Sequence, residues 1–299
     1  MKKKMTLEEG LSILKPGIEK AMMILDGYPT SALFTCEQYM QLYDCVYDMC
    51  VQSPPYEYCK ELYELFKKAL EESITLKVIP ALKDKPHIWL LNEVCNIWAK
   101  YKVMAKCLGG FFLYLDRHVA EDNKATSLNS LSICCFHDMV FKEVYPTILE
   151  AALNLISQDR CQNSGCSDLL KNVSTFFVEI GNGKMHYYDN FEAAILASSA
   201  EYYNQLLFKL LPHYSPVDYI QQAHRCYNQE KERATQFLNQ TSVEKLLQVV
   251  QEQLLGQNAM RARNSIENHK AECGDDSNSY QEVLLGCAGL NLGEGSSQG

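Results

Sequence analysis

Residues 39–50 read YMQLYDCVYDMC, a stretch that is apolar around too much of its circumference for an ordinary surface helix. One helical face is made by residues at three- and four-residue spacing, namely Tyr39, Leu42, Tyr43, Val46 and Cys50. Met40 and Tyr47 begin a second apolar stripe beside that face. One face can line the core of the chain. The second apolar stripe must be shielded from water by other residues, which come either from the rest of the chain or from another protein.

A second stretch with the same character covers residues 103–119, VMAKCLGGFFLYLDRHV. Its apolar positions again overfill one helical face: Cys107, Leu108, Phe111, Phe112 and Leu115. The Gly109-Gly110 pair interrupts this run and allows a close backbone approach or a local bend. The apolar run from 107 to 115 is much shorter than the roughly 20 residues that a membrane span requires. The stretch therefore predicts a buried or partner-facing helix.

The remainder of the chain also predicts helices, and no strand-like alternation competes with them. The expected helices cover residues 6–25, 35–51, 55–79, 86–101, 103–120, 127–157, 166–181, 184–210, 215–238 and 242–255. Prolines and glycines predict the breaks between them, including breaks at Pro80 and Pro86. Thr35 is the expected N-cap of the helix that holds Tyr39, and Thr241 or Ser242 that of the last helix. The predicted fold class is all-α.

Composition and charge narrow the possible functions. Of the 299 residues, 47% are hydrophobic and 22% are charged, which is typical of a globular chain. The formal net charge of −9 argues against binding to nucleic acid, because phosphate recognition depends on basic patches. The only basic run, residues 2–4, is not followed by an apolar segment, so neither a secretory signal nor a transmembrane segment is expected. The expected location is cytoplasm and nucleus.

The 13 cysteines suggest disulfides or zinc, but their spacing favours neither. No CxxC pair occurs, and the best local metal candidate is the run Cys134-Cys135-Phe136-His137. Adjacent cysteines on a helix point about 100° apart, so a buried helix is the preferred interpretation of that run. An odd number of cysteines without a secretory signal predicts reduced thiols. We therefore expect no metal and no other cofactor.

Catalytic sequence patterns are also missing. The chain has no GxGxxG after a strand, no GxxxxGK[ST], no HExxH and no GxSxG. Its carboxylates lie in helical surface patterns, of which Glu230-Lys231-Glu232-Arg233 is an example, and these favour solvated helix faces. The sequence therefore gives no reason to expect an enzyme.

Five separated blocks carry a family resemblance. They are LYDCVYDMC followed by Pro54-Pro55, KVMAKCLGGFFLYLDRHV at 102–119, LLKNVSTFFVEIG at 169–181, YYDNFEAAIL at 187–196 and EKERATQFL at 230–238. In this order they resemble successive parts of the amino-terminal half of a plant cullin of the class that builds SCF ubiquitin ligases. The resemblance extends from about Met5 to about Leu255.

The resemblance implies a non-catalytic scaffold built as a rod of stacked cullin repeats, a helical-bundle solenoid. It implies a first, adaptor-binding repeat at 1–125 and a second repeat at 126–255, with a boundary in the polar EDNKATS stretch. Residues 256–299 lose the apolar periodicity and are expected to form a flexible tail. In cullins, the second and fifth helices of the first repeat hold a BTB-fold Skp-type adaptor, which carries the F-box protein.

Ten positions of this chain match those adaptor-facing helices. They are Tyr39, Met40, Leu42, Tyr43, Val46, Tyr47, Cys107, Leu108, Phe111 and Leu115. Some of the ten must belong to the core, because one helical face cannot serve both purposes. The strongest expectations are Tyr43, Met40, Tyr47 and Phe111, whereas Cys107 departs from the bulkier residues that plant relatives tend to have there.

The end of the sequence departs from the family. Complete cullins continue into a third repeat and a globular region that holds the RING subunit and presents a modified lysine, and no segment here resembles either. No RING subunit is therefore expected as a partner. Three interpretations stay open: a competitor of complete cullins, a scaffold with another downstream partner, or a non-functional product. A different class, a helical tethering-type rod with other protein or membrane partners, is disfavoured by the acidic charge.

Overall fold

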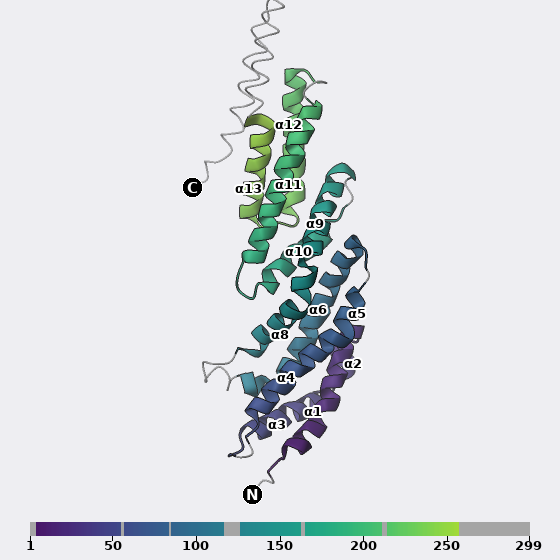
Figure 1. Ribbon diagram of the computed structural model, residues 1–299, viewed down its shortest axis with the longest axis vertical. Coiled ribbons are helices and arrows are strands. Elements are labelled where there is room, and N and C mark those ends of the chain that lie inside the picture. The colour runs from purple at the N-terminus through teal and green to yellow at the C-terminus, as the bar shows by residue number, and fades with distance from the viewer. Residues whose placement is uncertain are drawn as a thin grey trace, which may run out of the picture. The chain divides into compact units, whose positions relative to one another are not determined.

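The computed structural model describes residues 4–54, 57–83, 85–116, 126–162, 165–210 and 214–256, and within these ranges it contains helices and no strand (Figure 1). The all-α prediction is confirmed. The chain divides into two compact units: residues 1–155 with 175–187 form the first, and residues 156–174 with those from 188 onward form the second. Within the described ranges, no helix is long and apolar enough to cross a membrane.

The first unit contains most of the helices. They are α1 (Leu7–Met22), the 3₁₀ turn η1 (Met23–Asp26), α2 (Thr30–Leu33), α3 (Cys36–Cys50), α4 (Cys59–Ser73), the π turn η2 (Ile74–Val78), α5 (Ile79–Leu82), α6 (His87–Phe111), α8 (Leu128–Phe136) and the π turn η3 (His137–Phe141). The next two helices, α9 (Lys142–Gln162) and α10 (Ser167–Ile180), each have residues in both units. The rest are α11 (His186–Leu210), α12 (Pro216–Thr235), α13 (Gln240–Gln251) and the π turn η4 (Glu252–Gly256).

Side-chain caps fix the starts of several helices. The Thr35 hydroxyl accepts a hydrogen bond from the backbone N–H of Gln38, and the Gln38 side-chain oxygen accepts one from the Thr35 backbone N–H, which confirms the predicted N-cap of α3. At α13 the cap is Asn239, whose side chain accepts from the N–H of Ser242 at 2.8 Å. The prediction of Thr241 or Ser242 as this cap was wrong by a few residues.

Helix α3 lies close against α1 because two glycines of α1 leave room for its side chains. A Cβ added at Gly10 would overlap Met49, and one added at Gly17 would overlap Leu42. The inner face of α3 is consequently buried, including Met49 and Val46, which have no exposed surface. This packing decides which face of α3 is left toward solvent.

Helix α6 runs through the first unit and contacts α1, α3, α5 and α8. Its Trp98 and Tyr101 pack against Phe136 of α8, with ring centroids 4.8 and 5.0 Å apart. The Tyr101 hydroxyl donates to the backbone carbonyl of Ser132 at 2.9 Å, so the only polar atom of this buried side chain is satisfied. These contacts fix α6, which carries the second predicted stretch.

Two helix boundaries differ from the sequence prediction. Residues 86–101 and 103–120 were expected to be separate helices, but α6 is continuous from His87 to Phe111 and passes through Gly109 and Gly110. Pro80 was expected to end a helix, but helical structure continues from α4 through η2 into α5, where Pro80 occupies the first turn. Proline lacks an N–H and is tolerated in a first turn, and the preceding π turn adjusts the hydrogen-bond ladder there.

The repeat boundaries implied by the resemblance remain a prediction. Residues 121–125 of the polar EDNKATS stretch lie outside the described residues, and so do residues 257–299 of the expected tail. The two compact units do not divide at residue 125, because α8 and the beginning of α9 pack within the first unit.

A buried network of charges joins three helices of the second unit. Glu230 of α12 accepts hydrogen bonds from Arg160 at 2.5 Å, from Arg233 at 2.5 Å and from the Tyr203 hydroxyl at 2.9 Å. Arg160 also donates to Ser199 of α11. Only 1% of the Arg160 side chain and 2% of the Glu230 side chain are exposed. The prediction that Glu230 lies on a solvated helix face was wrong, because two of its partners, Arg160 and Tyr203, are distant in sequence and the local charge pattern does not reveal them.

The ionised form of Glu230 is favoured despite its burial. Burial alone would raise the pKa of its carboxyl, but the charges and hydrogen bonds of Arg160 and Arg233, together with the Tyr203 hydroxyl, outweigh that effect. The pKa of Glu230 consequently lies below its usual value. One guanidinium nitrogen, Nη1 of Arg160, is buried and has no hydrogen-bond partner among the described residues, so the charge of Arg160 depends strongly on Glu230 for its compensation.

Candidate functional site

Four of the ten predicted partner-binding residues reach the solvent on α3. Met40 and Tyr47 are 51% and 40% exposed, whereas Tyr39 and Tyr43 are half-buried. Their spacing along one helix places them on adjacent turns. We call these four residues, Tyr39, Met40, Tyr43 and Tyr47, the α3 surface. Exposed methionine and tyrosine side chains side by side are more typical of a protein interface than of free surface.

The other six predicted residues are buried within the chain. They are Leu42, Val46, Cys107, Leu108, Phe111 and Leu115, and none is more than 6% exposed. Phe111 has no exposed surface because the rings of Phe34 and Tyr39 pack on it at 5.3 and 4.9 Å. The structure therefore assigns these six to the core, and the expectation that Phe111 faces a partner is corrected.

Tyr39 connects the two predicted helices. Its hydroxyl donates to the backbone carbonyl of Cys107 at 3.3 Å, and its ring lies over Gly110, where any Cβ would overlap the hydroxyl. Burial, with a smaller contribution from Cys107, raises the pKa of the Tyr39 phenol, so it stays protonated and acts as a donor. The missing side chain at Gly110 thus determines how close α3 and α6 approach.

Sequence reasoning missed a second aromatic pair at this surface. Tyr114, in the helical residues 113–116 that follow α6, packs edge-on against Tyr47 with ring centroids 4.8 Å apart. Its neighbour Leu113 is 43% exposed. Periodicity placed Leu115 on the partner-facing side, but Leu115 is buried like Leu108 and Phe111, and Tyr114 is the residue that contacts Tyr47. Tyr114 therefore extends the α3 surface.

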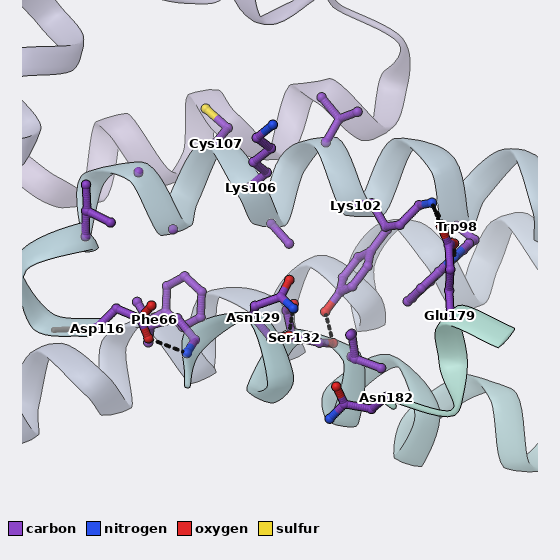
Figure 2. A pocket seen from close by; sticks show the side chains of 18 of the residues that line it. Phe66, Trp98, Lys102, Lys106, Cys107, Asp116, Asn129, Ser132, Glu179 and Asn182 are labelled. Carbon is purple, nitrogen blue, oxygen red and sulfur yellow. Dashed lines mark hydrogen bonds and ion pairs between the residues drawn. The ribbon is translucent and has the colours of Figure 1, made fainter. Parts of the chain in front are cut away.

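A groove of about 1100 Å³ runs beside α6 within the first unit (Figure 2). It begins near Tyr39 and Gly110, passes α8 and ends near Glu179. Lys102 and the indole N–H of Trp98 both donate to the Glu179 carboxylate, at 2.6 Å each, and Asp116 accepts from the backbone N–H of Leu128 at 2.8 Å. Because these carboxylates already hold structural partners, they are poorly suited to general acid or base catalysis.

The predicted metal candidate does not assemble a set of ligands. Cys134 is exposed and Cys135 is buried, as expected for neighbours on one helix. The two ring nitrogens of His137 lie 2.8 Å from Asp138 and 2.5 Å from the Tyr187 hydroxyl, so the imidazole is held by its own chain. Among the residues that the structure describes, no group of three or more His, Cys, Asp and Glu side chains could hold a metal ion.

The neighbouring glycines of α6 offer a matched test of the Tyr39 contact. Gly110→Ala places a methyl group on the Tyr39 hydroxyl, whereas Gly109→Ala has open space around the new methyl group. We expect Gly109→Ala to stabilise the chain by about 0.5–1 kcal/mol through helix propensity. Gly110→Ala should instead destabilise it by about 1 kcal/mol, because Tyr39 loses its hydrogen bond and packing. Urea denaturation measures both; shifts of the same sign would contradict the placement of Tyr39.

Comparison with known proteins identifies relatives over most of the chain. The family described as the cullin alpha solenoid domain matches residues 13–275, which extends past Leu255, where the resemblance was expected to end. Cullin-1 of Oryza sativa subsp. japonica is 38% identical over 259 residues, which cover 86% of this chain and 35% of that protein. The putative cullin-like protein 2 of Arabidopsis thaliana is 34% identical over 87% of this chain and 69% of its own length.

The length that is matched differs among these relatives. Cullin-2 of Arabidopsis thaliana is 32% identical over 91% of this chain, and the aligned part is 36% of that protein. The chain therefore spans about a third of cullin-1 and cullin-2 but most of the shorter cullin-like protein 2.

Proposed function

This chain belongs to the cullin family, and we propose that its first unit docks a BTB-fold Skp-type adaptor, with the F-box protein that the adaptor carries, as a non-catalytic scaffold of an SCF-type ubiquitin ligase. The observation that carries the proposal is the α3 surface. Met40, Tyr43 and Tyr47 remain accessible on a helix whose opposite face is held against α1. A surface with this composition, supported by a rigid core, is suited to a protein partner.

The rigidity of α3 supports the proposal because binding then costs little ordering entropy. The helix is capped at Thr35, its inner face is buried, and Tyr39 ties it to α6. An interface presented by such an element loses little conformational freedom when a partner docks.

A binding assay that offers two proteins separately tests this proposal. The chain is immobilised and incubated with the purified adaptor in one experiment and with the RING subunit in the other. We expect retention of the adaptor alone, because the resemblance concerns the adaptor-holding part of the family. Failure to retain the adaptor would refute adaptor docking, and retention of the RING subunit would show that the proposed partner set is wrong.

Competition follows from the same contact by mass action. A polypeptide that occupies the adaptor excludes any complete cullin that uses the same surface. An excess of this chain should therefore displace a complete cullin from an adaptor and F-box complex, in proportion to its concentration over its Kd. A competitor role is one form of the proposed function. If the complete cullin stayed on the adaptor at saturating concentrations of this chain, the competitor role would be ruled out.

The tethering-type alternative predicts a different partner. A rod of that class would bind membranes or other tethers, and sedimentation with anionic liposomes would detect this binding. The net charge of −9 opposes attraction to an anionic surface. The cytoplasmic and nuclear location stays a prediction.

A further inference from the structure

Two thiols meet at the corner between α3 and α4. Cys50 is the last residue of α3 and Cys59 is the first residue of α4, and the two thiols lie close enough for each to affect the pKa of the other. Both are free cysteines; Cys50 is 7% exposed and Cys59 is half-buried. Sequence spacing does not identify this pair, because the interval between the two residues matches no recognised disulfide or metal pattern.

The backbone holds the two cysteines near each other. The N–H of Tyr58 donates to the carbonyl of Met49 at 3.2 Å, and these residues directly precede Cys59 and Cys50. Met49 is itself fixed, because it is fully buried against Gly10 of α1. A disulfide requires two Cα atoms within about 7 Å and side chains that point toward each other, and this backbone hydrogen bond brings the segments that carry the two thiols together.

The environment distinguishes the two thiols. Burial raises the pKa of both, and that of Cys50, which is the more buried, is raised far above its usual range. At Cys59 the neighbouring Cys50 thiol acts in the opposite direction, but burial and the nearby Glu57 carboxylate outweigh it, so the pKa of Cys59 is also raised. Cys59 is also the more accessible of the two. An oxidant that enters from solvent should therefore react at Cys59 first.

We propose that Cys50 and Cys59 are a modification site, at which a peroxide oxidant converts the two thiols into an intramolecular disulfide. The Cys59 thiolate attacks one peroxide oxygen, the O–O bond breaks, and hydroxide leaves, which gives a sulfenic acid on Cys59. The Cys50 sulfur then attacks the Cys59 sulfur, the S–O bond breaks, and the Cys50 proton leaves with the oxygen as water. In sum, two thiols lose two electrons and two protons, and hydrogen peroxide becomes two molecules of water.

The high pKa of Cys50 slows its attack on the Cys59 sulfur, but the position of Cys50 beside Cys59 offsets this effect. A group held in contact with its target reacts at an effective concentration far above that of a free thiol in solution. Cys45, the nearest other cysteine in α3, is directed elsewhere, because its thiol donates to the carbonyl of Gly10 and lies near the sulfur of Met5. Cys59 is therefore the partner that the packing offers to Cys50. This inference does not depend on adaptor docking.

Peptide mapping of the full chain tests the pairing. The reduced protein is treated with hydrogen peroxide, denatured in excess N-ethylmaleimide, and digested with trypsin and a glutamyl endopeptidase without reduction. Cleavage after Asp48, Glu57 and Lys60 separates Cys50 from Cys59 and from Cys45, so a disulfide joins the peptides 49–57 and 58–60. We expect this linked pair, and we expect a dithiol reductant to abolish it.

Two variants make the result decisive. Cys59→Ser should leave Cys50 modified by N-ethylmaleimide, whereas Cys36→Ser, which changes an exposed thiol at the other end of α3, should leave the cross-link intact. The oxidised wild-type chain should also melt about 5 °C above the reduced chain, because a closed loop of this length restricts the unfolded state. Recovery of Cys50 as a free thiol, or its linkage to any other cysteine, would overturn the proposal, and so would a lower melting temperature on oxidation.

Discussion

Replacement of Glu230 by Gln should lower the free energy of unfolding by about 3–5 kcal/mol, because a buried charge is removed and its partners are left uncompensated. Arg160 loses its only carboxylate partner in the described structure, and its side chain is 1% exposed, so water cannot replace the lost contact. Arg233 is less affected because Asp159 still accepts from it at 2.8 Å. Most of the loss therefore arises at Arg160.

Urea denaturation followed by circular dichroism measures the Glu230→Gln effect at neutral pH. Glu232→Gln is the matched control, since it makes the same chemical change on an exposed position of α12 and should alter stability by less than about 0.5 kcal/mol. Addition of Arg160→Met to Glu230→Gln should restore much of the stability, because the uncompensated charge is then gone. Equal effects of the two glutamate substitutions would contradict the buried network.

The same network has a defined pH dependence. The pKa of Glu230 in the folded chain lies below its unfolded value of about 4.3. A carboxyl with a depressed folded pKa contributes its full stability above the unfolded pKa and loses it as the pH falls through the folded pKa. The difference between wild type and Glu230→Gln should therefore stay constant above about pH 5 and shrink below pH 4.

Replacement of Tyr43 by Ala should weaken adaptor binding about thirtyfold, equivalent to ~2 kcal/mol, without unfolding the chain. Tyr43 is half-buried at the centre of the α3 surface, between Met40 and Tyr47, and aromatic residues at the centre of an interface carry most of its binding energy. Titration calorimetry with the adaptor measures the change, and circular dichroism confirms that the helices remain.

Two controls separate binding from folding at this site. Tyr28→Ala removes an exposed tyrosine that lies outside the α3 surface, so it should leave the affinity unchanged. Phe111→Ala should lower the free energy of unfolding by about 3–5 kcal/mol, because it empties a fully buried site. If Tyr43→Ala behaved like Phe111→Ala, or left the affinity unchanged, Tyr43 would be a core or rim residue rather than an interface anchor.

The fold class and most helices could be predicted from the sequence because apolar periodicity and capping are local signals. The starts of α3 and α6, at Thr35 and Pro86, are cases in point. Boundaries that depend on tertiary packing could not be predicted in this way. Gly110 was expected to interrupt the helix, but it lies inside α6. The Tyr39 ring occupies the space beside Gly110 that the side chain of a larger residue would need.

The candidate site was only partly predictable for a related reason. Periodicity predicted two apolar stripes on α3, with Tyr39 and Tyr43 on the same stripe as Leu42 and Val46, but it cannot say which side chains another helix covers. That choice depends on Gly10 and Gly17, which bring α1 against Met49 and Leu42. Tyr114 was missed because its role depends on the end of α6, and Glu230 was misjudged because Arg160 is distant in sequence.

The π turn η3 has a consequence for how this chain should be aligned with its relatives. A π turn holds one residue more than an α turn over the same rise, and each residue corresponds to about 100° of rotation around the axis. Deletion of one residue between His137 and Phe141 would thus convert the π turn into an α turn and leave the buried side chains of α9, among them Ile148 and Leu155, facing their present neighbours. A relative with a single gap at this point would therefore keep the same core with no change in its apolar pattern downstream.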